Sequence, residues 1–193
     1  VYMPWLGKKA YDGIMAAYTA ASRKNGKKYI PLIKNATQLY VIERGALCGV
    51  VLDGSYNLTE ANYKTSLQNM VDRVLITDKD GNQIGVVEDT AAQQKYGVVQ
   101  TVYKQEDGKD AQTEAKALLQ TLEQTGSVTG CQGDSRAVSG YALIVQETTT
   151  GLFGKFYIES DTHTFTDGKH EMALTLAFSN MMDEKEIENQ SRG

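Results

Sequence analysis

The sequence has few prolines and few cysteines. It contains 2 prolines in 193 residues, both before residue 32, so long stretches are free to form helices and strands. Its 2 cysteines, Cys48 and Cys131, lie far apart. A disulfide between them is one alternative. Two buried reduced thiols are the expected state, because nothing else suggests a disulfide-dense secreted scaffold.

Long apolar runs and an excess of positive charge are also absent. No run approaches the roughly 20 apolar residues that a membrane-spanning helix needs, and the first residues lack the pattern of a signal peptide. The formal net charge of −4 leaves no electrostatic footprint for nucleic acid or an anionic membrane. Because the chain begins at Val1 in the middle of a pattern, the sequence predicts a fragment of a longer protein.

The clearest predicted element is a long antiparallel hairpin at residues 153–178. Asp167-Gly168 is a strong turn signal, because glycine accepts the positive φ that hairpin turns demand. In the second arm apolar residues recur at every second position, as in a strand with one buried face. These residues are Met172, Leu174, Leu176 and Phe178. The hairpin therefore closes a β domain near the end of the chain.

The N-terminal part predicts a helix followed by a small hairpin. Apolar residues recur at helical spacing over residues 5–24, and Asn25-Gly26 stops the helix. Two short strands follow at 29–34 and 38–45, and Pro31 marks the first as an edge strand. Residues 1–45 are therefore predicted to form a helix-hairpin subdomain, which is too small to bury much surface alone.

The remaining segments predict an α+β fold dominated by an antiparallel β-barrel. Strands are predicted at 58–67, 69–78, 83–89, 98–105, 127–133 and 141–146, with a helical turn at 91–97 and a helix at 111–124. The predicted division is a connection at 46–56, a split barrel at 57–90 and 126–178, an inserted helical segment at 91–125, and a charged, frayed tail at 179–193.

Four residues of the long hairpin could hold a divalent metal. Two carboxylates and two imidazoles are a plausible ligand set, and the period-2 spacing of Glu159, Asp161 and His163 places them on one face, with His170 beginning the facing arm. Charged residues on the solvent face of a surface ribbon produce the same pattern. We therefore expect no metal site and no bound cofactor.

Two glycine-containing segments invite a catalytic interpretation and do not support one. Residues 130–135 combine Cys131, Asp134 and Ser135, but a cysteine nucleophile needs a positioned base and no histidine is local. Residues 81–85 contain glycines within a hairpin and open no helix, so they lack the context of a phosphate cradle. The 11 tyrosines are spread along the chain and are expected at core edges and subunit contacts. No catalytic residue is predicted.

The order of several segments resembles the XkdQ/YqbQ-like proteins, which are baseplate hub proteins of contractile phage tails and of phage-tail-like bacteriocins. The segments are 69–74 (NMVDRV), 80–85 (DGNQIG), 95–100 (KYGVVQ), an alanine-rich helix and 157–165 (YIESDTHTF). The resemblance covers residues 5–45 and 57–178. Its most specific piece is the Ser160–Phe165 stretch, and it carries no catalytic residue across.

This resemblance implies a trimeric hub at the tip of the tail tube. In such hubs related β-barrels convert three-fold symmetry into a pseudo-six-fold ring that accepts the hexameric tube. The implied partners are the tube protein, the central spike and other baseplate proteins, in a particle that assembles from proteins made in the bacterial cytoplasm. A wall-binding or peptidoglycan-degrading tail module is the alternative, but the carboxylates do not form the pair that glycosidases use.

A ring-forming barrel must also control its strand edges, because free edges aggregate. Five residues near strand centres and ends are predicted to serve this purpose: Pro31, Lys64, Asp72, Arg73 and Asp78.

Overall fold

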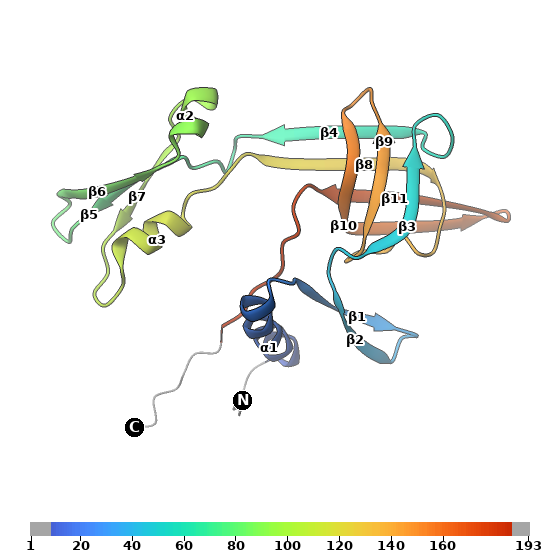
Figure 1. Ribbon diagram of the computed structural model, residues 1–193, viewed down its shortest axis with the longest axis horizontal. Coiled ribbons are helices and arrows are strands. Elements are labelled where there is room, and N and C mark those ends of the chain that lie inside the picture. Colours follow the sequence, from blue (N-terminus) through green and yellow to red (C-terminus); the bar gives the residue numbers. More distant parts are fainter. Residues whose placement is uncertain (1–8, 187–193) are drawn as a thin grey trace. The chain divides into compact units, whose positions relative to one another are not determined.

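The computed structural model describes residues 9–186, which form two compact units (Figure 1). The β unit comprises residues 9–63 and 125–186, and the inserted unit comprises residues 64–124. In chain order the elements are α1 (Ala10–Asn25), β1 (Tyr29–Lys34), β2 (Gln38–Glu43), β3 (Leu47–Asp53), β4 (Glu60–Ser66), β5 (Arg73–Thr77), β6 (Gln83–Glu88), α2 (Thr90–Tyr96), β7 (Gln100–Lys104), α3 (Ala111–Ala117), β8 (Glu123–Gln132), β9 (Ala142–Glu147), β10 (Leu152–Thr166) and β11 (Lys169–Ala177).

A six-stranded sheet in the order β3-β9-β10-β11-β8-β4 builds the β unit. The predicted hairpin is its centre, because β10 pairs with β9 through its first half and with β11 through its second. The apolar alternation of β11 is confirmed: Leu174 and Leu176 are 2% and 1% exposed. The sheet curves around one core, whose largest fully buried members are Leu52, Leu143, Leu152, Ile158, Leu176, Val128 and Val145.

The predicted barrel is not confirmed, because the sheet has two edges. β3 and β4 stand at the ends of the strand order, and β3 runs parallel to β9. The prediction treated residues 46–56 as a connection, and β3 occupies most of that segment. A parallel partner lies about ninety residues away in the sequence, so the local pattern around residue 50 gives no sign of it.

The inserted unit is larger than the predicted segment at 91–125. β5 and β6, which were assigned to the barrel, instead form a three-stranded sheet with β7 in the order β6-β5-β7. β5 pairs antiparallel with β6 and parallel with β7. α3 covers one face of this sheet, where Val74, Ile76 and Ala115 are buried together. The strand predicted at 98–105 therefore pairs with β5 within the inserted unit, so β5 does not belong to the six-stranded sheet.

Local signals place most helix ends, and α3 is the exception. α1 ends at Gly26, whose φ of 72° is the left-handed conformation expected at this position. The Asp110 side chain accepts a hydrogen bond from the Thr113 N–H, so the predicted cap is confirmed. However, α3 stops at Ala117 instead of residue 124, because Gln120 pairs with Val71 in a β-bridge and β8 begins at Glu123.

The chain after β11 lies along α1 in Figure 1. The Lys185 N–H donates to Oγ1 of Thr19, a residue that is 2% exposed, over 3.1 Å. Further polar contacts join Tyr11 to Asp183, Arg23 to Glu186, and Lys28 to Glu184. The predicted frayed tail at 179–193 is therefore wrong for residues 179–186, and residues 187–193 lie outside the described part. No helix within residues 9–186 is long and apolar enough to cross a bilayer.

We expect Leu174→Asp or Leu176→Asp to abolish soluble folding. A buried unpaired carboxylate costs several kcal/mol, which is comparable with the roughly 5–15 kcal/mol that stabilises a domain. The control is Thr162→Asp, which adds the same charge at an exposed position of the neighbouring strand. Thermal melts of all three variants check this. Wild-type melting temperatures for both leucine variants would contradict the assigned strand phase.

Candidate protein-interaction surfaces and the histidine cluster

The inserted unit has a sheet face that α3 does not cover. Paired residues share a face, so Leu75, Val86 and Val102 form one row across the three strands. Val86 and Val102 are 36% and 55% exposed, and the neighbouring Ile84 is 51% exposed. Apolar side chains at the centre of an otherwise solvated sheet face are typical of a contact surface. We call these four residues the open face.

Charged residues border the open face at both ends. Arg73, Glu88 and Gln100 form the adjacent row, in which Arg73 Nε lies 3.6 Å from a carboxylate oxygen of Glu88. Lys104 belongs to the row on the other side, opposite Thr77. An apolar centre with a polar rim is the arrangement found in protein–protein interfaces. The side chains alternate along residues 84–88, which already indicates a strand with two faces. The prediction assigned this strand to the barrel and so missed the open face.

The β unit carries a groove of about 550 Å³ beside the β1–β2 hairpin. Its walls come from the hairpin, from the start of β3 and from the loop at 133–141. The lining residues are Leu32, Ile33, Lys34, Leu47, Cys48, Ser135, Arg136, Val138, Ser139 and Tyr141. Ile33 and Leu47 are 72% and 56% exposed. The groove therefore offers a second apolar surface, at an edge of the six-stranded sheet.

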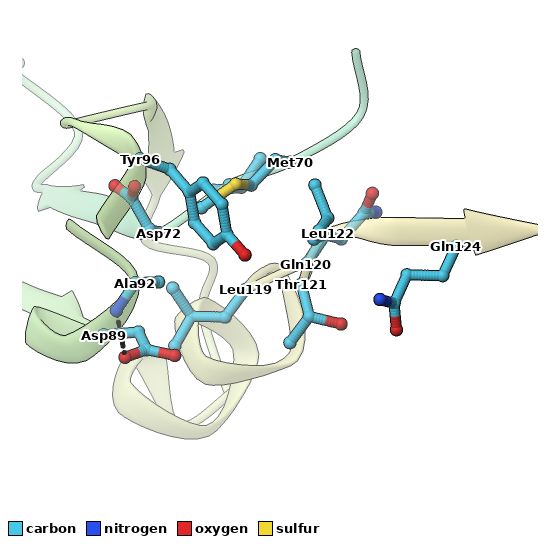
Figure 2. A pocket seen from close by; sticks show the side chains of 11 residues that line it. Met70, Asp72, Asp89, Ala92, Tyr96, Leu119, Gln120, Thr121, Leu122 and Gln124 are labelled. Carbon is cyan, nitrogen blue, oxygen red and sulfur yellow. Dashed lines mark hydrogen bonds between the residues drawn. The ribbon is translucent and has the colours of Figure 1, made fainter. Parts of the chain in front are cut away.

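A smaller pocket of about 270 Å³ lies within the inserted unit. Figure 2 shows the Tyr96 ring between Met70 and Leu119, with Thr121 and Leu122 nearby. The Asp89 carboxylate on its border caps α2 by accepting the Ala92 N–H over 3.0 Å (Figure 2). The pocket thus has a mixed lining of apolar side chains, neutral polar side chains and two carboxylates, Asp72 and Asp89, which both accept backbone N–H groups of the fold.

Asp72 holds the inserted unit together from a buried position. It is 1% exposed, and its Oδ1 accepts the Val99 N–H over 2.9 Å. Its backbone carbonyl accepts the Asp89 N–H over 2.8 Å. These bonds join the start of β5 to the cap of α2 and to the chain entering β7. Asp72 is therefore an internal tie and not the edge-control residue that the sequence predicted.

Of the other four predicted edge-control residues, two lie on edge strands and two do not. Lys64 lies on β4, an edge strand of the six-stranded sheet, as predicted. Pro31 lies in the two-stranded β1–β2 hairpin. Arg73, by contrast, begins the central strand of the three-stranded sheet, and the Asp78 carboxylate accepts the N–H groups of Asp80 and Asn82 within a turn.

The structure brings together three of the four hairpin residues considered for metal binding. Nδ1 of His163 lies 2.8 Å from Nε2 of His170, and Nε2 of His163 lies 3.5 Å from Asp161 Oδ2. Glu159 lies elsewhere and pairs with Arg44. Within residues 9–186 no group of three or more His, Cys, Asp or Glu side chains is arranged to hold a metal ion.

A β-bulge explains why Glu159 separates from the other three residues. β10 and β11 shift register between Ile158 and Ser160. Beyond the bulge, Asp161 pairs with Leu174 and His163 pairs with Met172, so both face the inner side of the sheet. Their side chains are 21% and 15% exposed. The prediction of a shared solvent face is therefore wrong, because a one-residue insertion reverses the alternation.

The loop that begins near Cys131 is structural. Both cysteines are free thiols; Cys131 is fully buried and Cys48 half-buried. Burial raises the pKa of the Cys131 thiol to about 11, so it stays protonated and is a weak nucleophile at neutral pH. The Arg136 guanidinium, together with the Arg136 N–H, lowers the pKa of Asp134 to about 2. The glycines at 81–85 lie in the β5–β6 turn and β6, as the sequence predicted.

A solved structure with a similar fold is a prophage tail protein. The 43 kDa tail protein of prophage MuSo2 from Shewanella oneidensis superposes with a TM-score of 0.54 at 13% identity, covering 83% of this chain and 53% of that protein. The tail protein from Neisseria meningitidis MC58 gives a TM-score of 0.49 at 14% identity, covering 84% of this chain and 54% of that protein. The first comparison shows a shared fold.

The sequence itself identifies the family. A family model described as YQBQ-like matches residues 4–177, and the chain therefore belongs to the YQBQ-like family. The phage-like element PBSX protein XkdQ of Bacillus subtilis (strain 168) is 26% identical over 192 residues, covering 90% of this chain and 56% of that relative. The resemblance to XkdQ/YqbQ-like proteins is thus confirmed, and the chain spans little more than half of this relative's length.

We expect Asp72→Ala to destabilise the inserted unit by about 1–3 kcal/mol, because the half-buried Val99 N–H loses its acceptor. The control is Asp80→Ala in the exposed β5–β6 turn, which should change stability by less than about 0.5 kcal/mol. Amide exchange of β5–β7 measures the effect within this unit. Equal protection in the two variants would show that Asp72 is not the internal tie.

Proposed function

We propose that this chain is a structural protein of a phage tail or phage-tail-like particle, and that it acts there as a baseplate hub protein joining the tail tube to the central spike. The observation that supports this most directly is the family match over residues 4–177. The relative XkdQ is named as a protein of a phage-like element, and the protein that shares the fold is named as a tail protein.

The surfaces of the two units are suited to such a role. A hub must contact several neighbours at once, and this chain offers the open face on one unit and the groove on the other. The partners we propose are the tail tube protein, the central spike and other baseplate proteins. We further propose that three copies surround the tube axis, as the resemblance to hub proteins implies, and that they contact one another through a heterologous interface whose rotation closes.

We propose that the chain is not an enzyme. The groups that could carry chemistry are already engaged in the fold: the Cys131 thiol is buried, and His163 and Asp161 hold the loop at 133–141. These contacts support a structural role for the residues that first suggested catalysis.

We expect the double variant Ile84→Asp, Val102→Asp to lose incorporation into particles by at least about tenfold, because the centre of an interface carries most of its binding energy. Both side chains are more than half exposed, so the melting temperature should change little. The control is Gln100→Asp, which adds charge at the rim of the same face. Co-purification with particles assembled from the other tail proteins measures this. Wild-type incorporation of the double variant would exclude the open face as a required contact.

We also expect no hydrolysis of purified peptidoglycan, because no nucleophile, base and orienting group come together in the described residues. Release of reducing ends or free amines is the measurement. A signal that disappears on substitution of Glu159 or His163 would contradict a purely structural role and favour the wall-degrading alternative.

A further inference from the structure

The only two histidines in the sequence are in contact with each other. Their ring centroids lie 5.1 Å apart, and Phe165 stacks on His170 with a centroid separation of 4.0 Å and an interplanar angle of 18°. Histidine is the side chain that ordinarily changes its charge between about pH 5 and pH 8. Both groups of this kind in the chain therefore occupy one site.

The neighbouring carbonyl determines how the protons are arranged. Nε2 of His163 lies 3.1 Å from the Ala137 carbonyl oxygen, which can only accept, so this nitrogen carries a hydrogen. In neutral His163 the other nitrogen, Nδ1, is then an acceptor. It accepts from Nε2–H of His170 over 2.8 Å. The pair thus requires one unprotonated nitrogen, Nδ1 of His163.

The same residues fasten the loop at 133–141 to the hairpin. The Ser139 N–H donates to Asp161 Oδ1 over 2.6 Å, and the Gly133 N–H donates to the His170 carbonyl over 2.8 Å. Gly133 lies so close that a Cβ there would be 2.2 Å from the His170 ring. This loop forms one wall of the groove beside the β1–β2 hairpin, so its attachment controls the shape of that groove.

We propose that His163 and His170 form a proton-sensitive latch, which holds the loop at 133–141 while the pair carries at most one extra proton and releases it when both imidazoles are charged. The first proton is accommodated on Nδ1 of His170, whose Nε2–H still donates to His163. The second proton must bind Nδ1 of His163. Two N–H donors and two positive charges then face each other across 2.8 Å, and the rings must separate.

Charged and titratable groups from several elements surround the histidine pair. Asp161 Oδ2 lies 3.5 Å from Nε2 of His163. Asp134 on the loop faces His170, and its negative charge is shared with Arg136. Cys131, from β8, is neutral because of its raised pKa. The neighbours of His170 on β11, Lys169 and Glu171, are exposed on the other face. The step that opens the latch is the second proton, because it replaces the acceptor Nδ1 of His163 by a second donor.

The test is amide exchange and imidazole NMR on the whole chain between about pH 7.5 and about pH 4.5. At the higher pH both histidines should be Nε2–H tautomers. As the second imidazole becomes charged, the protection factor of the Ser139 N–H should fall by at least about tenfold. His170→Gln supplies an amide donor to His163 without a titrating charge, so this variant should keep Ser139 protected. His163→Gln, whose amide can donate to Ala137, should do the same.

The two variants separate the latch from ordinary carboxylate titration, because both keep Asp161. Constant Ser139 protection in the wild type while both imidazoles become charged would overturn the proposal. Loss of Ser139 protection at the same pH in both glutamine variants and in the wild type would also overturn the proposal. Protonation of the Asp161 carboxylate, which accepts the Ser139 N–H, would then explain the loss.

Discussion

The pairing of β10 with two partners is the constraint on which the β unit depends. Tyr157 pairs with Ala142 of β9 and also with Ala177 of β11, so one residue links the registers of three strands. Since side chains alternate along a strand, a slip by one residue would remove Phe156 and Ile158 from the core. The bulge after Ile158 then resets the alternation, which turns Asp161 and His163 to the inner side.

This resetting determines what the polar residues of the hairpin do. With the regular alternation, Asp161 and His163 would lie on the outer face as a charged ribbon. With the bulge, they bind the Ser139 N–H and the Ala137 carbonyl and so position the loop at 133–141. The loop in turn completes the groove beside the β1–β2 hairpin.

The sequence predicts those features that arise within a few residues of the chain. The alternation of β11, the end of α1 at Gly26 and the cap of α3 at Asp110 are all local signals. The bulge at Ile158 leaves no local mark, so the faces of the histidines were assigned wrongly. The parallel pairings of β3 with β9 and of β5 with β7 join distant segments. For this reason the boundary of the inserted unit and the edges of the main sheet were not predictable.

The proposed hub role places this chain around the tail tube. Cryo-electron microscopy of the intact particle tests it most directly, through the position and copy number of this chain. The proposal predicts three copies surrounding the tube axis at its junction with the spike, with the open face or the groove in contact with neighbouring proteins. A position away from the axis, or six copies in place of three, would contradict it.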